Sequence, residues 1–507
     1  MAALPDTSLH DKRWTLVAIL GATFMLLVDV TIVQVALPSI QKDLQASFTS
    51  LQWVIDAYAL VLAAFILISG ALSDRLGRKR VFVGGVAIFT LASLLCGLAT
   101  GPVFLDVARG IQGLGGAAMF ATSLALIAQE FTGPARGKAI AYWGATVGVG
   151  VAVGPLVGGA LTEAFGWPWI FLVNLPIGVV VIALAVSKIP NVRDPDAHHT
   201  DYGGLVTFAG ALGLLVFGLL RGETLGWSSS VILGSFAGAA VLAVAFVLVE
   251  RRQARPMFDL SLFRQRAFVG VQLGTFAIGA GMFAVLPYLT LYLQNVLGYS
   301  PLEGGLRMLP LMAMVFVVPL VTRRTTERLP GGLVLGFALL VSGAGLLLME
   351  LVSPTSAWTV LLPGMIVAGL GVGLANPAIA HIALAVVAPQ RSGMASGISN
   401  TFRIGGLATG VAGLGALLQH GIATKLPNAS RGTIDAIAAA GARAPGVSPT
   451  VARPAFVHGL ELVIAAGGVL VLAGAVAAFV LIGAGNLHPA PAATPAPAPA
   501  PTAATPL

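Results

Sequence analysis

Fourteen long apolar stretches divide this chain of 507 residues, and they limit its possible folds more than any other feature. The hydrocarbon core of a bilayer is about 30 Å thick, so a helix that crosses it needs about 20 apolar residues. Unpaired backbone groups are costly in hydrocarbon, so each stretch is predicted to form an α-helix. The expected spans are residues 14–38, 51–72, 81–99, 102–128, 139–161, 169–187, 203–220, 231–249, 268–296, 305–321, 331–351, 359–384, 397–418 and 457–482. The predicted fold class is therefore an all-α polytopic membrane protein.

The composition supports a membrane protein and excludes several other classes. Charged residues make up 9% of the chain, whereas soluble domains carry about 25%. The net charge of +8 lies in short segments between apolar stretches, which indicates membrane topology rather than nucleic acid binding. The single cysteine, Cys96, excludes an internal disulfide and a cysteine-built metal site. The first stretch contains Asp29 and has no small-residue cleavage site, so we expect a retained span rather than a signal peptide.

The distribution of Lys and Arg predicts the orientation in the membrane. With the N-terminus inside, the outer segments hold Lys42, Arg221, Arg307, Lys425, Arg431, Arg443 and Arg453, and Arg109 lies within a span. The other 20 of the 28 Lys and Arg residues fall in the inner segments. Cytoplasmic loops carry an excess of Lys and Arg, so both termini are predicted to be cytoplasmic.

The order of spans and polar segments predicts six helices, then two, then six. This layout suggests two six-helix bundles related by a pseudo-twofold axis, with an inserted helix hairpin. The end of the chain is rich in Pro, Ala and Thr and is predicted to be a disordered cytoplasmic tail. The expected divisions are a cytoplasmic N-terminus (1–13), an N-terminal bundle (14–188), linkers with the hairpin (189–266, helices 203–220 and 231–249), a C-terminal bundle with an outer loop (267–482, loop 419–455) and the tail (483–507).

The segment 70–80 reads G-A-L-S-D-R-L-G-R-K-R and connects the second and third spans. Charges at this density cannot lie in hydrocarbon, so we expect a short cytoplasmic loop. Gly77 is expected to permit the tight turn, and Asp74 to tie a helix end to cations across the interface between the two halves. Gly70, Arg75 and Arg78 complete this predicted gating cluster, which is expected to bias the balance between inward-open and outward-open states.

The fifth span contains the sequence G-V-A-V-G-P-L-V-G-G over residues 150–159. Pro155 frees a backbone carbonyl and bends the helix, and glycines leave a smooth face along which helices slide. Gly150, Gly154, Gly158 and Gly159 are therefore predicted to form a mechanical hinge with Pro155, without binding anything themselves.

The first span contains Asp29 within L-L-V-D-V-T-I-V-Q-V-A-L-P. An ionised carboxylate at that depth costs several kcal/mol, so Asp29 either holds a proton or pairs with a cation. Both arrangements suit a group that takes up and releases protons during transport. The alternative is a buried Asp that only fixes helix packing.

Two further spans contain ionisable residues. Asp56 lies near the outer end of the second span, where it either contributes to a cation site with Asp29 or is simply hydrated at the membrane surface. Arg109 in the fourth span is a permanent cation that must face the protein interior. It either pairs locally with Asp106 or senses the protonation of a carboxylate, with Asp29 the leading candidate. Gln34 and Gln112 are assigned with Asp56 to substrate binding.

Several other polar residues carry weaker signals. Glu461 and His381 are expected to be structural, and Arg403 to extend its charge toward the membrane surface. Amides in the second half that could line a cavity are Gln272, Gln294, Asn295, Asn376 and Asn400. The sequence has no G-x-x-x-x-G-K-[ST] motif for ATP and no H-E-x-x-H or G-x-S-x-G motif of an enzyme.

Taken together, these motifs resemble the fourteen-span drug:proton antiporter branch of the major facilitator superfamily, a family of multidrug and antibiotic efflux proteins. The resemblance covers residues 14 to about 482, with the motifs concentrated in the first half. In two positions the chain departs from the family pattern. Gln34 stands where Asn is usual, and Pro168 stands where Arg is usual between Trp167 and Trp169, which removes a cation from that loop.

This resemblance implies a proton-coupled antiporter that exports amphipathic, often cationic drugs or antibiotics by alternating access. Asp29 and Arg109 would be the coupling pair, and Asp56 would recognise the substrate's charge. The implied protein is a monomer in the lipid bilayer of a bacterial cytoplasmic membrane. It is driven by the proton gradient rather than ATP, and uses no cofactor, metal or nucleic acid.

Alternatives stay open at this stage. A transporter of the same fold could carry a lipid, an amino acid, another metabolite or an antibiotic made by the same cell, although acidic residues in the cavity favour cations. A membrane receptor that has lost transport is a more distant alternative, and the intact Asp29, Arg109 and Gly-Pro motif argue against it.

Overall fold

The computed structural model describes residues 9–190, 201–253, 258–326, 329–385, 387 and 392–482. Over these ranges the chain is helical without any strand, and fourteen helices are long and apolar enough to cross a membrane. The predicted fold class and number of spans are therefore confirmed. The predicted disordered tail and most of the first central linker lie outside the described residues.

The first six spans are nearly continuous helices joined by short connections. Glycine permits one of these connections, because Gly77 has a φ of 102° between the second and third helices. The sixth span consists of two consecutive helices. The elements are α1 (Leu9–Leu44), α2 (Phe48–Leu76), α3 (Arg78–Gly97), α4 (Pro102–Glu130), α5 (Gly133–Phe165), α6 (Trp169–Leu172) and α7 (Asn174–Lys188).

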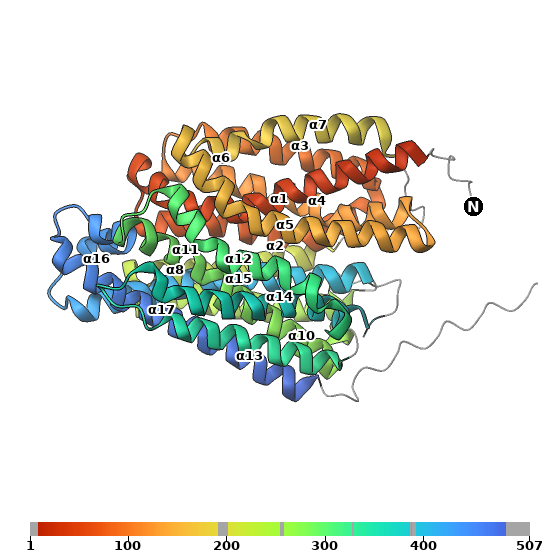
Figure 1. Ribbon diagram of the computed structural model, residues 1–507. Helices are drawn as coiled ribbons and strands as arrows, with labels where there is room; N and C mark the ends of the chain where they lie inside the picture. Colours follow the sequence, from red (N-terminus) through yellow and green to blue (C-terminus); the bar gives the residue numbers. More distant parts are fainter. Residues whose placement is uncertain are drawn as a thin grey trace, which may run out of the picture.

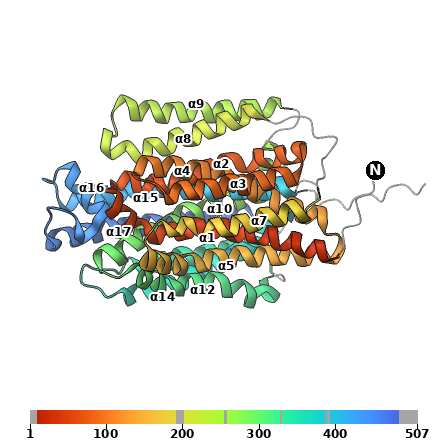
Figure 2. The same cartoon turned by 90° about the horizontal axis from the view of Figure 1, so that it is seen from above.

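Helices α8 (Tyr202–Leu225) and α9 (Ser230–Arg252) form the hairpin expected between the two halves. Figure 2 shows it on one side of the molecule, beyond α2. Val216 and Leu220 of α8 form a small apolar cluster with Ala59 of α2 and with residues of the thirteenth span. The hairpin thus packs on helices from both halves, and it covers one of the seams between them.

The last six spans are less regular. The ninth contains two π-helical turns, at Ile278–Met282 and Tyr292–Val296, which often occur where a helix is locally adapted. The elements are η1 (Leu260–Arg264), α10 (Arg266–Ala277), η2 (Ile278–Met282), η3 (Phe283–Val285), α11 (Leu286–Leu291), η4 (Tyr292–Val296), α12 (Pro301–Thr326), α13 (Gly331–Met349), η5 (Trp358–Leu361), α14 (Leu362–Ala385), α15 (Ser392–Lys425), α16 (Arg431–Ala440), η7 (Gly441–Arg443) and α17 (Pro449–Leu481).

The helices extend beyond the predicted spans, and two boundaries are corrected. Residues 9–13, expected in a separate N-terminal segment, belong to the first helix, because α1 begins at Leu9. The outer segment 419–455 is not an extended loop: α15 continues to Lys425 and α16 lies within it. Ser430 caps α16 by accepting from the Thr433 N–H, and the far end of α16 is buried. Hydropathy detects only the part of a helix that lies in hydrocarbon, so these polar extensions escaped it.

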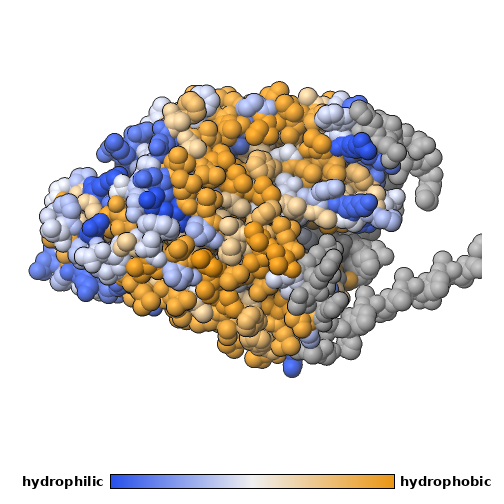
Figure 3. Space-filling view, viewed as in Figure 1, coloured by the Kyte–Doolittle hydropathy of each residue, from blue (hydrophilic) through white to orange (hydrophobic). Residues whose placement is uncertain are grey.

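Figure 1 shows the first six spans in one bundle and the last six in another. The bundles lie close together at the end that carries α16, called here the α16 end, and diverge toward the end where the N-terminus lies, called the N-terminal end. Figure 3 shows a broad apolar band around the middle of the surface and hydrophilic residues at both ends. This is the surface expected of a protein surrounded by lipid.

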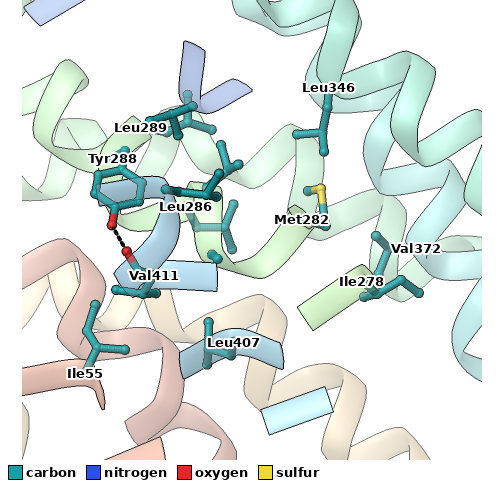
Figure 4. Packing of buried hydrophobic residues seen from close by; sticks show 14 of the residues in the cluster. Ile55, Ile278, Met282, Leu286, Tyr288, Leu289, Leu346, Val372, Leu407 and Val411 are labelled. Atoms are coloured by element: carbon teal, nitrogen blue, oxygen red, sulfur yellow. Dashed lines mark hydrogen bonds between the residues drawn. The ribbon is translucent and has the colours of Figure 1, made fainter. Parts of the chain in front are cut away.

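The buried apolar core is continuous between the two bundles. Figure 4 shows Ile55 of α2 near Leu407 and Val411 of α15, beside the irregular ninth span. The Tyr288 hydroxyl donates to the Val411 carbonyl in the same region. The two halves are therefore packed together from the middle of the molecule to the α16 end.

Candidate functional site

An ion pair between α1 and α4 lies at the centre of the first bundle. The Arg109 Nη1 donates to Asp29 Oδ2 at 2.6 Å. Both side chains are removed from solvent, with exposed fractions of 2% for Arg109 and 0% for Asp29. The residues are 80 positions apart, so only the packing of the two helices brings them together.

Neutral polar side chains from three helices complete this pair. Gln112, one turn after Arg109, accepts from Arg109 Nη1 at 2.6 Å and donates to Asp29 Oδ1 at 2.9 Å. Gln112 Nε2 also donates to Ser93 Oγ of α3 at 2.8 Å. Asn174 at the start of α7 donates to Asp29 Oδ1 at 3.4 Å and to Ser93 Oγ at 3.3 Å. Both carboxylate oxygens therefore have donors.

The remaining faces of the guanidinium contact α2. Arg109 Nε donates to the Val54 carbonyl at 3.0 Å, and the guanidinium carbon lies 4.2 Å from the centre of the Tyr58 ring. An aromatic face at this distance attracts a cation. The alternative that Arg109 pairs locally with Asp106 is wrong in this structure. Arg109 pairs with Asp29 and forms no ion pair with Asp106.

The energetics make this arrangement sensitive to a proton. Removing one partner of a buried ion pair costs about 3–5 kcal/mol, because the other charge is left without compensation. An Arg guanidinium does not lose its proton in proteins, so only Asp29 can change charge within the pair. The site can therefore exist in a charged, paired state or in a state with a neutral carboxyl and a free cation.

Asp56 lies apart from this network. Its side chain is fully buried in α2, and neither carboxylate oxygen has a hydrogen-bond partner. One turn earlier, Gln52 donates to the Tyr288 hydroxyl at 3.2 Å and to the Val411 carbonyl at 2.9 Å, and so joins α2 to the second half. Asp56 is thus a buried carboxyl at the seam between the halves, and none of the described residues supplies a cation that pairs with it.

The other two residues assigned to substrate binding occupy different surroundings. Gln34 is buried in α1, with an exposed fraction of 2%. Gln112 is fully buried, and its contacts belong to the Asp29 and Arg109 network. In this conformation Gln112 therefore supports the ion pair rather than facing a cavity.

The charged segment 70–80 is not the short loop expected: residues 70–76 end α2, residues 78–80 begin α3, and only Gly77 lies between the two helices. One contact of this segment also differs from its prediction. Asp74 accepts from Arg78 Nε and Nη2, both at 3.1 Å, within its own half. The expected contact of Asp74 with a cation of the other half is absent among the described residues, because Arg78 lies one turn away and satisfies the carboxylate locally.

The other charged residues and Gly70 of the segment 70–80 have distinct environments. Arg78 Nη1 donates to the Ala125 carbonyl of α4 at 3.4 Å, and Lys79 donates to the Val186 carbonyl of α7 at 2.7 Å. Arg75 is exposed, and the space beside Gly70 is open. The segment 70–80 therefore fastens the junction of α2 and α3 to α4 and α7 of the first bundle.

The glycines of α5 face two different partners. A Cβ atom on Gly154 would lie 1.8 Å from Thr31 Oγ1 of α1, and one on Gly150 would lie 2.9 Å from the Leu27 Cβ. Gly158 similarly faces Ile32 of α1, at 2.8 Å. These positions let α5 and α1 approach closely within the first bundle.

An adjacent face of the same helix contacts the second bundle. A Cβ on Gly159 would lie 2.5 Å from the Pro301 carbonyl oxygen at the start of α12. The Pro155 carbonyl oxygen would lie 2.4 Å from a Cβ on Gly305, also in α12. The motif of α5 thus forms a close contact between the halves as well as within one.

The buried amide side chains of the second half mostly donate hydrogen bonds to backbone carbonyls. Gln294 donates to the Val35 carbonyl of α1 at 2.8 Å, and Asn295 donates to the Ala439 carbonyl of α16 at 3.1 Å. Gln272 donates to Ser399 Oγ at 3.1 Å. These contacts fix packing, so the three amides do not form the cavity lining considered from the sequence.

Sequence reasoning missed Ser93 and Asn174 as members of the charged network. A single Ser in an apolar span carries little signal. Asn174 lies in the apolar stretch W-P-W-I-F-L-V-N-L-P-I-G (residues 167–178), and an amide in such a stretch is the signal that could have identified it. Which residues surround Asp29 depends on the packing of five helices.

Comparison with known proteins places this arrangement in a family. A model described as Major Facilitator Superfamily matches residues 19–411. The multidrug resistance protein Stp of Mycobacterium tuberculosis is 37% identical over 429 residues, which cover 83% of this chain and 79% of that protein. The puromycin resistance protein pur8 of Streptomyces alboniger is 37% identical over 479 residues, covering 93% and 91%. A probable actinorhodin transporter of Streptomyces coelicolor is 37% identical over 422 residues, covering 80% and 73%.

A solved structure supports the same fold. The chain is similar to a bacterial homolog of the human lysosomal transporter Spinster, in an inward-facing and unoccupied conformation, with a TM-score of 0.63. The match covers 95% of this chain and 98% of that chain at 18% identity. At this identity the likeness concerns the fold alone.

Proposed function

The chain belongs to the Major Facilitator Superfamily, and on that premise we propose that it is a proton-coupled antiporter that exports amphipathic, cationic drugs or antibiotics. The proposal places it as a monomer in the cytoplasmic membrane of a bacterium, with both termini in the cytoplasm. The proton gradient drives export, without ATP or a cofactor. One elementary charge moved through 100 mV supplies about 2.3 kcal/mol, so one or two protons sustain a substantial gradient.

The observation that carries the proposal is the buried pair of Asp29 and Arg109. A proton that reaches Asp29 neutralises the carboxylate and leaves the Arg109 charge without its partner. The guanidinium then needs new acceptors, and the contact between α1 and α4 weakens. This change shifts the equilibrium between the inward-open and outward-open states. When Asp29 releases the proton toward the cytoplasm, the pair forms again. Gln112 and Asn174 hold the carboxylate in place for this exchange.

Asp56 supplies the attraction for a cationic substrate in this proposal. A buried carboxylate without a partner is costly, so Asp56 favours either a proton or a cation. Gln34 and Gln112 provide amide groups for substrates in other states of the cycle. An amphipathic cation would neutralise Asp56 and place its apolar part on the surrounding aliphatic side chains.

Two elements permit the alternation between states. Gly150, Gly154, Gly158 and Gly159 let α5 slide on its neighbours around Pro155, as the close contacts with α1 and α12 favour. The cluster of Gly70, Asp74, Arg75, Gly77 and Arg78 fastens the end of α2 in the present state. We propose that this cluster releases its contacts when the N-terminal end closes.

The test is proton-driven uptake of a fluorescent lipophilic cation, ethidium, into inverted membrane vesicles. Wild type is compared with Asp29→Asn, and the uncoupler-sensitive rate is measured. We expect uptake in wild type that an uncoupler abolishes, and no uphill uptake in Asp29→Asn. Vesicles that acidify but take up none of several cations would refute the export of cations.

A matched pair of variants separates coupling from substrate recognition. Asp56→Asn is expected to reduce uptake of cations while retaining uptake of a neutral antibiotic, because only the attraction for charge is lost. Asp29→Asn should reduce uphill transport of both. Equal transport by Asp29→Asn and wild type would contradict the assignment of Asp29 to coupling.

The names of the relatives favour a second candidate function. One is a puromycin resistance protein and another a probable actinorhodin transporter, both from Streptomyces. An antibiotic made by the same cell is therefore an alternative substrate to foreign drugs. Deleting the gene in its host and measuring the secreted and intracellular amounts of the host's antibiotics distinguishes the two.

A further inference from the structure

A carboxylate of the first half caps a helix of the second half at the α16 end. Glu163, near the end of α5, accepts from Ser300 Oγ at 2.5 Å and from the Leu302 N–H at 3.1 Å. Leu302 lies in the first turn of α12, where backbone N–H groups have no partner within the helix. A negative charge at this position also interacts favourably with the helix dipole.

A second carboxylate acts in the opposite direction. Asp435 of α16, in the second half, accepts from the Phe48 N–H at 3.3 Å. Phe48 is the first residue of α2, which belongs to the first half. The other oxygen of Asp435 accepts from Gln419 of α15 at 3.4 Å, so the carboxylate is held on its own side as well. Each half therefore supplies an acid that caps a helix of the other.

We propose that Glu163 and Asp435 are gate residues, a reciprocal pair of latches that hold the α16 end closed and must release for that end to open. The sites lie on two different contacts between the halves: α5 with α12, and α16 with α2. Opening the α16 end separates each carboxylate from the N–H groups it caps. The proposal rests on the alternating access described above and adds two residues to it.

The hinge glycines explain why Glu163 reaches its partner. Gly159 lies one turn before Glu163 on α5, and a Cβ there would lie 2.5 Å from the Pro301 carbonyl oxygen. The absence of a side chain at residue 159 lets the first turn of α12 approach α5. The motif expected to act as a hinge therefore also positions one latch.

The caps of the first turn of α12 are divided between the two halves. Ser300 and Glu303 form a local capping box, in which the Glu303 carboxylate accepts from the Ser300 N–H at 3.0 Å and Ser300 Oγ accepts from the Glu303 N–H at 3.3 Å. Because these bonds lie within one segment, they stay formed when the halves separate. Glu163 adds bonds that exist only in the closed state, and this difference is what makes it a latch.

The test measures how fast a cysteine at the α16 end reacts. Leu51 has an exposed fraction of 2% and lies one turn into α2, so Leu51→Cys reports the opening of that end. Purified protein is treated with a maleimide without substrate or proton gradient. The native Cys96 is fully buried, and its labelling in protein without the reporter is the blank.

We expect Asp435→Ala to raise the labelling rate of Leu51→Cys roughly fivefold, from the usual effect of losing a helix cap. Glu163 is exposed, so water screens its charge. Glu163→Ala is therefore expected to raise the labelling rate of Leu51→Cys by only about two- to threefold. The double variant should show about the product, because both latches stabilise one closed state. Asp435→Asn and Glu163→Gln keep an acceptor oxygen and should recover part of the effect.

A second reporter separates gating from local loosening. Leu67 lies in the later part of α2, which points toward the N-terminal end of the molecule, and it packs against Gly397 of α15. Opening of the α16 end by alternating access closes the other end, so labelling of Leu67→Cys should fall in the latch variants. Local fraying of α16 or α12 would leave it unchanged and would refute the proposal.

The matched control is Glu461→Ala. Glu461 is an acid whose partner, His458 at 3.3 Å, lies in the same helix α17. Its loss should leave both labelling rates unchanged. Unchanged rates in Asp435→Ala and Glu163→Ala would overturn the latches even if proton-coupled transport is confirmed. Altered labelling without any transport in wild type would support the latches while refuting the proposed antiport.

Discussion

The two bundles use their buried polar residues in different ways. The first contains a charged pair, Asp29 with Arg109, surrounded by donors and acceptors from four helices, α2, α3, α4 and α7. The described polar contacts of the second are mainly neutral, such as Gln272 with Ser399 and Asn295 with a backbone carbonyl. Arg403 lies in a span of the second half, and its partner is the amide of Asn400.

This difference separates two tasks within one fold. A group that changes charge is needed where a proton binds, and Asp29 meets that requirement in the first bundle. The second bundle packs its helices at short distances: a Cβ on Gly345 would lie 2.2 Å from the Ala368 nitrogen, and one on Gly371 would lie 2.4 Å from the Ser342 nitrogen. The first bundle has equally close contacts, such as Gly154 with Thr31, so the buried charge rather than the closeness of packing distinguishes the two bundles.

The largest expected effect concerns the two intramembrane arginines. Arg109→Met leaves Asp29 buried without a cation and should lower stability by about 3–5 kcal/mol. The double variant Asp29→Asn with Arg109→Met should regain the wild-type melting temperature in detergent, but not transport. Arg403→Met removes a cation with a neutral partner, so its cost should be clearly smaller. Equal losses of stability for Arg109→Met and Arg403→Met would contradict the difference proposed between the two bundles.

A smaller effect is expected at the glycines. Gly154→Ala places a Cβ against Thr31 Oγ1 and should cost about 1–3 kcal/mol, as overpacking usually does. Adding Thr31→Ala removes that oxygen and should restore part of the melting temperature. In the second bundle, no described atom beyond the adjacent backbone of its own helix lies within 4 Å of a Cβ at Gly413, so Gly413→Ala should be neutral or stabilising. A wild-type melting temperature for Gly154→Ala alone would show that α1 and α5 adjust freely.

Two buried glutamines sharpen the comparison at the level of transport. Gln112→Ala removes contacts to both members of the charged pair and should lower proton-driven uptake about tenfold, the effect of losing about 1.4 kcal/mol. The dependence of uptake on pH should shift as well. Gln272→Ala removes a contact with Ser399 and should leave the pH profile unchanged. Identical pH profiles for the two variants would contradict the difference between the charged network of the first bundle and the neutral contacts of the second.

The smallest effect concerns the titration of Asp435. Burial in the closed state raises the pKa of Asp435, and the hydrogen bond from the Phe48 N–H opposes this shift only in part. Arg221 and Glu223 of α8 and Arg431 of α16 line the same cavity of about 270 Å³ as Asp435. Because the closed state binds the proton more readily, acidification should stabilise closure. This stabilisation is complete below the pKa of an exposed Asp and disappears as pH rises through the raised value.

Maleimide reacts with the thiolate, so each labelling rate is divided by that of a free thiol at the same pH. This normalised rate for Leu51→Cys should therefore slow a few-fold as the pH falls at the α16 end. Asp435→Asn should remove this dependence, whereas Glu461→Gln should retain it. A rate that rises with acidity in wild type and persists in Asp435→Asn would assign the titration to another group. The outcome would show whether the second half contributes a proton-sensitive contact of its own.

The sequence alone determined the number of spans, the helical class and the hairpin between the halves. Hydropathy follows from single residues and their near neighbours, so no long-range contact is needed to read it. The same holds for the turn at Gly77, where a φ of 102° requires glycine. The family resemblance also required only local motifs, and the comparisons confirmed it.

The tertiary structure decided which polar residues meet. Arg109 pairs with Asp29 rather than with Asp106, and Asp74 pairs with the nearby Arg78 rather than with a cation of the other half. Among the described residues, Asp56 has no hydrogen-bond partner. Residues 9–13 and 431–440 are helical where a separate N-terminal segment and an outer loop were expected, because capping and burial support helices beyond the hydrocarbon. Contacts between residues tens of positions apart depend on helix rotation and approach, which no local pattern encodes.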